Sequence, residues 1–377
     1  MEKPPEFITG KTWEKVLNFI ALSDEPPPYL LLDKDVIQEK ITTIGRHIRN
    51  ARVFYAVKAN PDIEILRFLN SFGIGFEIAS EGELQILSSI GVEPRRIITS
   101  NPVKTFKFLE CATAYGVEYF AYDSRVEVDK LVRYAPRAKV YVRLTVPNEG
   151  SEWPLSKKFG VELEEAAMLL SYAAERGLRP VGITFHVGSQ CTNLYNWNAA
   201  LGKARELWQV AESQGLSLEM LNIGGGYPIR YTKDVADVAT IEKKIDHAFR
   251  QKFPEGVEVF IEPGRAVVGD AGIFVANVIG KARRGDENWL YIDVGVFNGL
   301  MESVGGIKYK HVVGSRSEPK KWTIAGPSCD SFDVIDREVE LPEPEVGNRL
   351  LILSSGAYTI SYASEFNGFS IPKSILI

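Results

Sequence analysis

Short apolar runs rich in β-branched and aromatic residues recur through the first two thirds of the chain, and segments with helical spacing separate most of them. The runs cover residues 53–57, 75–79, 96–100, 119–123, 139–146, 182–187, 219–223 and 257–262. The clearest helical segments are 63–72, 81–90 and 164–177. Strands that alternate with helices in this way predict an α/β fold, a TIM-like (β/α)8 barrel. A doubly wound parallel sheet is the structural alternative.

The pattern changes after about residue 266. Strand-like runs now follow one another with turns and little helix, at 271–280, 289–295, 321–326 and 349–356. This arrangement predicts an antiparallel β-sheet or β-barrel domain. The start of the chain, with a helical stretch near 11–22, is expected to join it. We therefore predict a barrel domain over residues 30–265 and a β domain formed by residues 1–29 and 266–377.

Composition narrows the classes of function. The 377 residues carry a net charge of −5 and no basic tract stands out, which argues against a nucleic-acid partner. Three cysteines without regular spacing favour neither a disulfide framework nor a zinc site, so no metal is expected. The polar N-terminus does not resemble a signal peptide, and no apolar run approaches the roughly 20 residues that span a bilayer. A cytoplasmic protein without a membrane segment is the expectation.

Polar residues stand at or just past the ends of the predicted strands, where barrel enzymes carry their chemistry. The set is Lys58, Glu77, Ser80, Asn101, Asp123, Arg143, His186, Ser189, Asn222, Gly224, Gly225, Gly226, Glu262 and Arg265. Each has an ordinary interpretation alone: Lys58 as a solvated loop residue, the glycines as a tight turn, His186 as a core histidine. Their convergence on one rim favours a functional site.

This set suits one kind of cofactor. A lysine amine forms a Schiff base with an aldehyde, and consecutive glycines let backbone N–H groups approach phosphate oxygens. An arginine adds a charged fork for the phosphate. A carboxylate beside a pyridine nitrogen keeps that nitrogen protonated, and an imidazole can stack on the ring. The pattern therefore favours a site for pyridoxal 5′-phosphate (PLP).

Six segments carry a resemblance to a known family. They are YAVKANP (55–61), FHVGSQ (185–190), NIGGGYP (222–228), EPGR (262–265), GPSCDSFD (326–333) and GAYT (356–359). In this order they resemble the fold-type III, alanine racemase-like PLP decarboxylases. WPLSKKFG (153–160) and SYASEFNGF (361–369) are also similar to the bacterial ornithine decarboxylase group. The resemblance covers the chain from about residue 13 to its end.

The resemblance implies roles for individual residues. Lys58 would hold the cofactor aldehyde, Glu262 would bond the pyridine nitrogen, and His186 would stack on the ring. Glu77 stands where the family has an aspartate close to the lysine and Arg143, and Asn222 stands where many relatives carry aspartate. The implied phosphate ligands are Ser189, Gly224, Gly225, Gly226, Gly264, Arg265 and Tyr358.

The resemblance also implies a homodimer with shared active sites. The loop with Cys329 and Asp330 would reach from the β domain into the partner subunit's site, where Cys329 protonates the carbanion and Asp330 holds the substrate's distal ammonium. The alternative for Cys329 is an inert buried thiol. Lys158 and Asp333 resemble an ion pair across the interface, although either is equally explained as a solvated surface charge.

The predicted reaction is decarboxylation of L-ornithine to putrescine and CO2, in polyamine biosynthesis. Diaminopimelate decarboxylases carry glutamate where this chain has Asp330, and Glu302 is a second candidate for the distal amine. One methylene changes binding by only about 1–3 kcal/mol, so L-lysine, which yields cadaverine, stays open as a substrate. A racemase on this fold would need a tyrosine in place of Cys329. A non-catalytic regulatory homologue tends to lose cofactor-binding residues, and here they are present.

Overall fold

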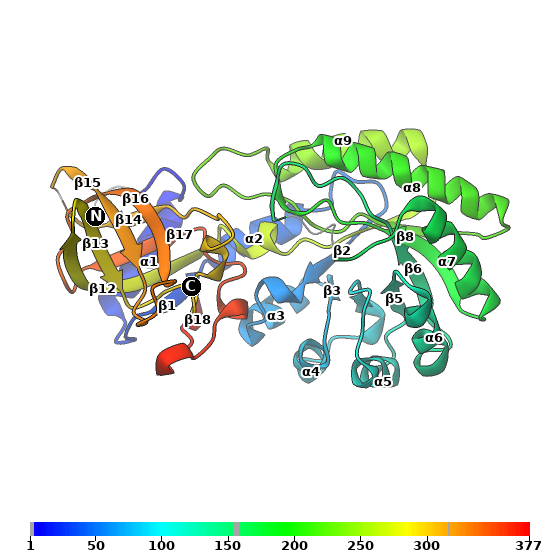
Figure 1. The fold of residues 1–377 in the computed structure, drawn as a ribbon, viewed down its shortest axis with the longest axis horizontal. Helices are drawn as coiled ribbons and strands as arrows, with labels where there is room; N and C mark the ends of the chain where they lie inside the picture. The colour runs from blue at the N-terminus through cyan, green and yellow to red at the C-terminus, as the bar shows by residue number, and fades with distance from the viewer. Residues whose placement is uncertain (1–3, 154–157, 316) are drawn as a thin grey trace. The chain divides into compact units, whose positions relative to one another are not determined.

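The computed structural model describes residues 4–153, 158–315 and 317–377 (Figure 1). The chain divides into two compact units. One, the barrel unit, comprises Ile41–Pro228 and Ala236–Gly264, and the other, the β unit, comprises the chain up to Lys40, Ile229–Val235 and Arg265–Ile377. The predicted boundaries of 30 and 265 therefore differ from the observed ones at residues 30–40 and 229–235. Tyr29–Leu32 is a fully buried strand of the β unit's sheet, which explains the first difference.

The barrel unit contains a closed barrel of parallel strands in the order β10-β11-β2-β3-β4-β5-β6-β8 (Figure 1). The bounds are β2 Ala51–Ala56, β3 Gly75–Glu77, β4 Ile97–Thr99, β5 Tyr119–Tyr122, β6 Lys139–Arg143, β8 Arg179–Thr184, β10 Met220–Asn222 and β11 Glu258–Ile261. Every predicted strand run forms one of these strands. The barrel prediction is confirmed, and the doubly wound alternative is wrong.

Seven helices of the barrel unit follow its strands, and five of them begin at a polar residue whose side chain caps the first turn. The seven are α3 Ile63–Asn70, α4 Glu81–Ser89, α5 Phe106–Tyr115, α6 Arg125–Tyr134, α7 Leu163–Glu175, α8 Tyr195–Ser213 and α9 Val238–Lys252. Side chains of Asp62, Ser80, Thr105, Ser124 and Asp237 accept hydrogen bonds from the first-turn N–H groups of five of them. Short 3-10 turns, η1 Val57–Ala59 and η2 Pro94–Arg96, and a two-stranded sheet of β7 Ser151–Trp153 and β9 Ser189–Cys191 complete the unit.

The barrel interior is filled with side chains. Seven strands each contribute one residue to a buried cluster of Phe54, Ile98, Ala121, Tyr141, Val181, Met220 and Phe260. The remaining strand, β3, contributes Gly75, where a Cβ would lie 2.3 Å from the Phe54 ring. Because side chains fill the interior, the strand ends and the loops that follow them are where a barrel of this kind carries its chemistry.

The β unit is built on a mixed sheet in the order β14-β17-β12-β13-β15-β16, with β1 pairing both β12 and β18. The strands are β1 Tyr29–Leu32, β12 Gly272–Arg284, β13 Glu287–Ile292, β14 His311–Val313, β15 Pro319–Ala325, β16 Val334–Pro342, β17 Arg349–Leu353 and β18 Lys373–Leu376. The predicted antiparallel sheet needs correction, because β13 pairs β15 and β1 pairs β18 in parallel.

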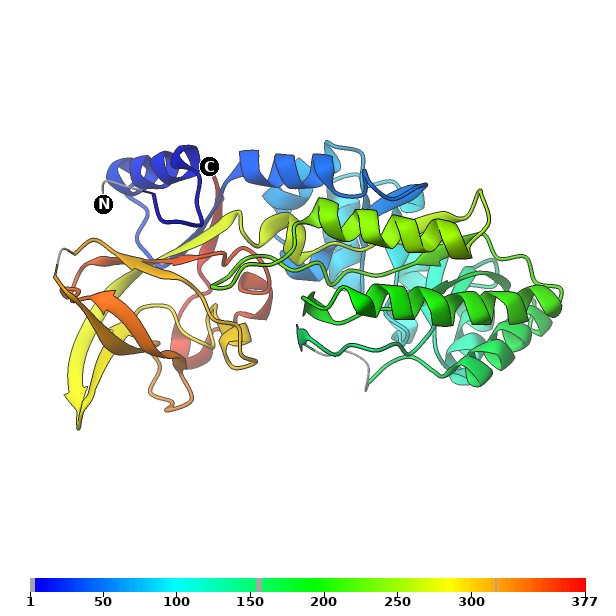
Figure 2. The same ribbon diagram turned by 90° about the horizontal axis from the view of Figure 1, so that it is seen from above.

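Helical segments of the chain outside the barrel are α1 Gly10–Leu22, α2 Lys34–Thr43, α10 Arg265–Val268, η3 Met301–Ser303, η4 Ile360–Tyr362 and η5 Phe366–Gly368. Figure 2 shows α1, in deep blue, lying beside the sheet. Its side chains Trp13 and Val16 pack into a buried cluster with Tyr29, Val275 and Leu351 of the sheet. The N-terminal segment thus joins the β unit, as the sequence predicts. Within the described residues, no helix is long and apolar enough to cross a membrane.

Candidate active site

Lys58 and Glu77 form the ion pair at the centre of the site. Lys58 lies in η1, directly after β2, and Glu77 is the last residue of β3, the neighbouring strand. The Lys58 Nζ lies 3.1 Å from Glu77 Oε2. Glu77 is 1% exposed, and its other oxygen, Oε1, is buried without a hydrogen-bond partner among the described residues. A buried carboxylate oxygen of this kind indicates that a bound group completes the site.

Glu262 directly follows β11 and is the second buried carboxylate of the site. Burial first, and then the charge of Glu77, raise its pKa to about 7, whereas Lys58 opposes this shift. Its Oε1 accepts hydrogen bonds from the Ser100 hydroxyl and from Asn222 Nδ2, the latter at 2.5 Å. Whether the Glu262 carboxylate is ionised therefore depends on the groups that surround it.

His186 lies two residues past β8 and is a neutral imidazole. Its Nδ1 accepts a hydrogen bond from the Gly188 N–H at 3.0 Å, so Nε2 carries the ring proton. Burial and the charges of Arg143 and Lys58 lower its pKa to about 3. Arg143, the last residue of β6, also has its pKa lowered by burial, an effect that Glu262 opposes.

The Gly224–Gly226 loop follows β10 and runs against other backbone. A Cβ on Gly225 would lie 2.5 Å from the Glu262 carbonyl oxygen, and one on Gly226 would lie 2.4 Å from the Gly188 carbonyl oxygen. Gly224 and Gly226 also adopt φ values of 66° and 93°. Glycine is required at these positions, and consecutive glycines allow an anion to approach the backbone closely. The predicted ligand Ser189 begins β9 and is half-buried, and Gly264 is buried in the loop after β11.

The predicted ligands Arg265 and Tyr358 belong to the β unit. The Arg265 guanidinium makes a two-pronged pair with Glu302, Nη1 to Oε2 and Nη2 to Oε1 at 2.6 Å each, and also bonds the Tyr231 hydroxyl. It lies 4.8 Å from the Tyr358 ring centroid. Tyr358 has a φ of 55°, an uncommon backbone conformation for a bulky residue that clusters at functional sites. Glu302, predicted as an amine ligand, is thus a buried counterion of Arg265.

Cys329 and Asp330 lie in the exposed loop between β15 and β16. The Cys329 thiol and N–H both donate to Asn367 Oδ1, at 3.4 and 3.2 Å. The thiol is exposed, which contradicts the burial that the alternative for Cys329 supposes. Asp330 Oδ1 accepts from the Phe332 N–H at 2.9 Å, which closes the turn.

Asp333 holds this loop in place. It is 3% exposed, and its carboxylate accepts hydrogen bonds from the N–H groups of Val296 and Ser328 at 2.7 and 3.0 Å. The interpretation of Asp333 as a solvated surface charge is therefore wrong. Lys158 is exposed, and residues 154–157 of the WPLSKKFG motif lie outside the described residues.

The barrel residues fit pyridoxal phosphate: a lysine amine, a buried carboxylate, a neutral imidazole and a triple-glycine loop meet at adjacent strand ends. The structure brings Lys58, Glu77, Arg143, His186 and Glu262 together in one unit, whereas Arg265, Tyr358, Cys329 and Asp330 lie in the other. Ser100 is a site residue that the sequence did not predict, because Asn101 is the polar residue directly past the predicted strand 96–100. The only signal for Ser100 was its place at the end of β4.

The comparisons agree with this chemistry. Residues 34–269 match the family model described as pyridoxal-dependent decarboxylase, pyridoxal binding domain. A lysine/ornithine decarboxylase of Selenomonas ruminantium is 38% identical over 93% of this chain and 90% of its own length. A Xenopus laevis protein named antizyme inhibitor 2 is 30% identical over 96% of this chain and 84% of its own length. The structure of a Vibrio vulnificus lysine/ornithine decarboxylase complexed with putrescine aligns with a TM-score of 0.89 and 31% identity, covering 98% of this chain and 99% of that one.

Proposed function

Because this chain belongs to the pyridoxal-dependent decarboxylases, we propose that it removes the α-carboxylate of L-ornithine, yielding putrescine and CO2. The observation that carries the proposal is the arrangement of Lys58 with two buried carboxylates, Glu77 and Glu262, at adjacent strand ends. Bound pyridoxal phosphate supplies an electron sink for the pair of electrons left when CO2 departs. The residues of this chain bind and orient the cofactor and the substrate, and they supply the proton.

Each residue of the barrel unit has a task in this proposal. The Lys58 amine holds the cofactor aldehyde, and Glu77, 3.1 Å from Nζ, anchors the ammonium form of that amine. Glu262 pairs with the ring nitrogen. His186, neutral at physiological pH, offers a flat uncharged face to the ring. The barrel unit's proposed cofactor residues also include Arg143, Ser189, Gly264 and the Gly224–Gly226 loop. Arg265 and Tyr358 are proposed phosphate ligands by resemblance to the family.

Asp330 is the proposed ligand of the substrate's distal ammonium, since an exposed carboxylate beside the Cys329 thiol suits a cationic chain end. L-Lysine is longer by one methylene, which a fitted pocket discriminates by only about 1–3 kcal/mol. The relatives support both substrates, because two of them carry the name lysine/ornithine decarboxylase. The test compares kcat/KM for L-ornithine, L-lysine, L-arginine and meso-diaminopimelate. A preference for diaminopimelate or arginine would contradict the proposal.

We further propose a homodimer in which Cys329 of each chain serves its partner's Lys58. Mixing Lys58→Ala and Cys329→Ala proteins, each inactive alone, tests this arrangement. Random exchange of subunits makes half of the dimers mixed, and each mixed dimer holds one intact site of two. Activity should therefore recover to about a quarter of the wild-type value. No recovery after verified subunit exchange would place both groups in one chain.

A non-catalytic regulatory role is the second candidate, because one relative is named an antizyme inhibitor. The retention of Lys58 beside the buried carboxylates Glu77 and Glu262 supports the enzyme instead. Purified protein that contains pyridoxal phosphate and releases CO2 from L-ornithine contradicts the regulator. CO2 release also contradicts a racemase.

A further inference from the structure

Two neutral side chains, Ser100 and Asn222, donate hydrogen bonds to one oxygen of the buried Glu262 carboxylate. Ser100 follows β4, Asn222 ends β10, and Glu262 follows β11. Ser100 and Glu262 are each 7% exposed, and Asn222 is fully buried. Both neutral side chains donate to the same atom, Glu262 Oε1. The contacts bring together residues that are 162 and 40 positions apart in the chain.

The direction of each hydrogen bond follows from counting donors and acceptors. Asn222 Oδ1 accepts from the Gly224 N–H at 2.9 Å, which turns its Nδ2 toward Glu262. Nδ2 has two hydrogens, and its partners are Glu262 Oε1 and Ser100 Oγ, the latter at 3.2 Å. The Ser100 hydroxyl therefore accepts from Asn222 and gives its single hydrogen to Glu262, because the carboxylate is a stronger acceptor than the Tyr141 hydroxyl, which lies 2.9 Å from Ser100 Oγ. In such a series of hydrogen bonds each bond polarises the next, which strengthens the last one, from Ser100 to Glu262.

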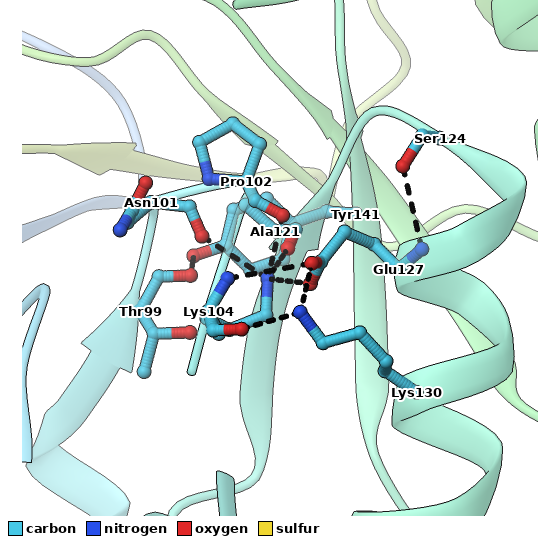
Figure 3. A network of polar contacts seen from close by, with 9 residues as sticks. All are labelled: Thr99, Asn101, Pro102, Lys104, Ala121, Ser124, Glu127, Lys130 and Tyr141. Atoms are coloured by element: carbon cyan, nitrogen blue, oxygen red, sulfur yellow. Dashed lines mark hydrogen bonds and ion pairs between the residues drawn. The ribbon is translucent and has the colours of Figure 1, made fainter. Parts of the chain in front are cut away.

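The segment that carries Ser100 is fixed from both sides. On one side the Tyr141 hydroxyl donates to the Thr99 carbonyl at 2.9 Å. On the other, the fully buried Lys104 ammonium donates to the carbonyls of Asn101 and Pro102 at 3.1 and 2.9 Å (Figure 3).

Glu127 holds the Lys104 side chain in place on this second side. Its carboxylate lies 3.3 Å from Lys104 Nζ and also pairs with Lys130, whose ammonium bonds the Lys104 carbonyl (Figure 3). Burial lowers the pKa of Lys104 to about 8, and Glu127 counters this effect. The loop after β4 is thus a rigid support for the Ser100 hydroxyl.

We propose that Ser100 and Asn222 are positioning residues that keep the Glu262 carboxylate ionised and fix its orientation, so that Oε2 pairs with the ring nitrogen of pyridoxal phosphate. This inference rests on the cofactor role proposed for Glu262. The two donors oppose burial and the nearby charge of Glu77, which both favour the protonated acid. The neutral side chain of Asn222 favours the ionised form of Glu262, because an aspartate at position 222 would set a third carboxylate against Glu262 and Glu77.

The test follows the protonation of Glu262 in the apoprotein by infrared difference spectroscopy. The carboxylic acid band that is absent from Glu262→Gln reports this residue alone. Ser100→Ala should move its titration upward by about one pH unit, because a hydrogen bond to a charged group is lost. Asn222→Asp, which is nearly isosteric and keeps an acceptor for Gly224, should move it upward by about two or more. Ser88→Ala, the same change on an exposed turn of α4, is the matched control and should leave the titration in place.

Cofactor affinity is the second readout. At pH 6, below the titration midpoint of Glu262 in both proteins, the dissociation constant of pyridoxal phosphate should rise about tenfold in Ser100→Ala, the counterpart of a shift of one pH unit. Unshifted titrations in both Ser100→Ala and Asn222→Asp would overturn the inference even if both proteins bind the cofactor. Wild-type apoprotein that binds no pyridoxal phosphate would instead overturn the proposed function, so the two failures are distinguishable.

Discussion

Replacing Glu302 by glutamine removes the negative charge opposite Arg265 and keeps the side chain's shape. The pair is 3% and 4% exposed, with both N–O contacts at 2.6 Å. Removing one partner of a buried pair costs roughly 3–5 kcal/mol, because the other charge stays buried without compensation. Glutamine retains one acceptor for the guanidinium, so we expect the lower end, about 3 kcal/mol. Arg265 stays charged in the variant, because a guanidinium is not deprotonated in proteins.

Urea unfolding of the apoprotein measures this loss, with the fluorescence of Trp289 and Trp322 reporting on the β unit. Glu64→Gln is the matched control. Its pair with Arg67 is 60% and 54% exposed, and such a pair contributes less than about 1 kcal/mol. A stability of Glu302→Gln within about 0.5 kcal/mol of the wild type would refute the reasoning. If Glu302 instead bound the substrate's distal ammonium, the variant would unfold like the wild type and raise KM for L-ornithine at saturating cofactor.

Three further variants test the barrel unit. Lys58→Ala should abolish the visible absorbance of bound pyridoxal phosphate and almost all CO2 release, and full activity would rule out the assigned role of this lysine. Gly225→Ala should weaken cofactor binding at least about tenfold, since displacing the Glu262 carbonyl 2.5 Å away costs roughly 1–3 kcal/mol; Gly202→Ala in α8, where a Cβ meets no atom within 4 Å, is the control that should bind normally. For Glu262→Gln the stability of the apoprotein should be compared at pH 5 and pH 8. Because the pKa of Glu262 is raised from 4.5 to about 7 in the fold, the folded wild type keeps a proton that the unfolded chain has lost in this window. The wild type should therefore lose stability relative to Glu262→Gln as pH rises, and a constant difference between the two proteins would count against the buried carboxylate.

Local patterns in the chain were enough to predict the barrel. A buried parallel strand is recognisable from its own residues, because it forms a short run of β-branched and aromatic residues whichever strands it pairs with. Motif order likewise placed Lys58, His186 and Glu262 at strand ends. The β unit was harder to read: β16, Val334–Pro342, carries charged residues along an exposed face, and β14 and β18 are only three and four residues long.

The pairing of distant residues was decided by the tertiary structure alone. No spacing rule links Ser100 to Glu262 across 162 positions, or Arg265 to Glu302 across 37. Closing the barrel brings β4, β10 and β11 to one rim, and only there does a serine that looks ordinary in the sequence become a donor to a buried carboxylate. The sequence by itself therefore determined which residue types stand at the strand ends. The fold decided which of them touch, because burial and hydrogen-bond partners are properties of the packed chain rather than of neighbours along it.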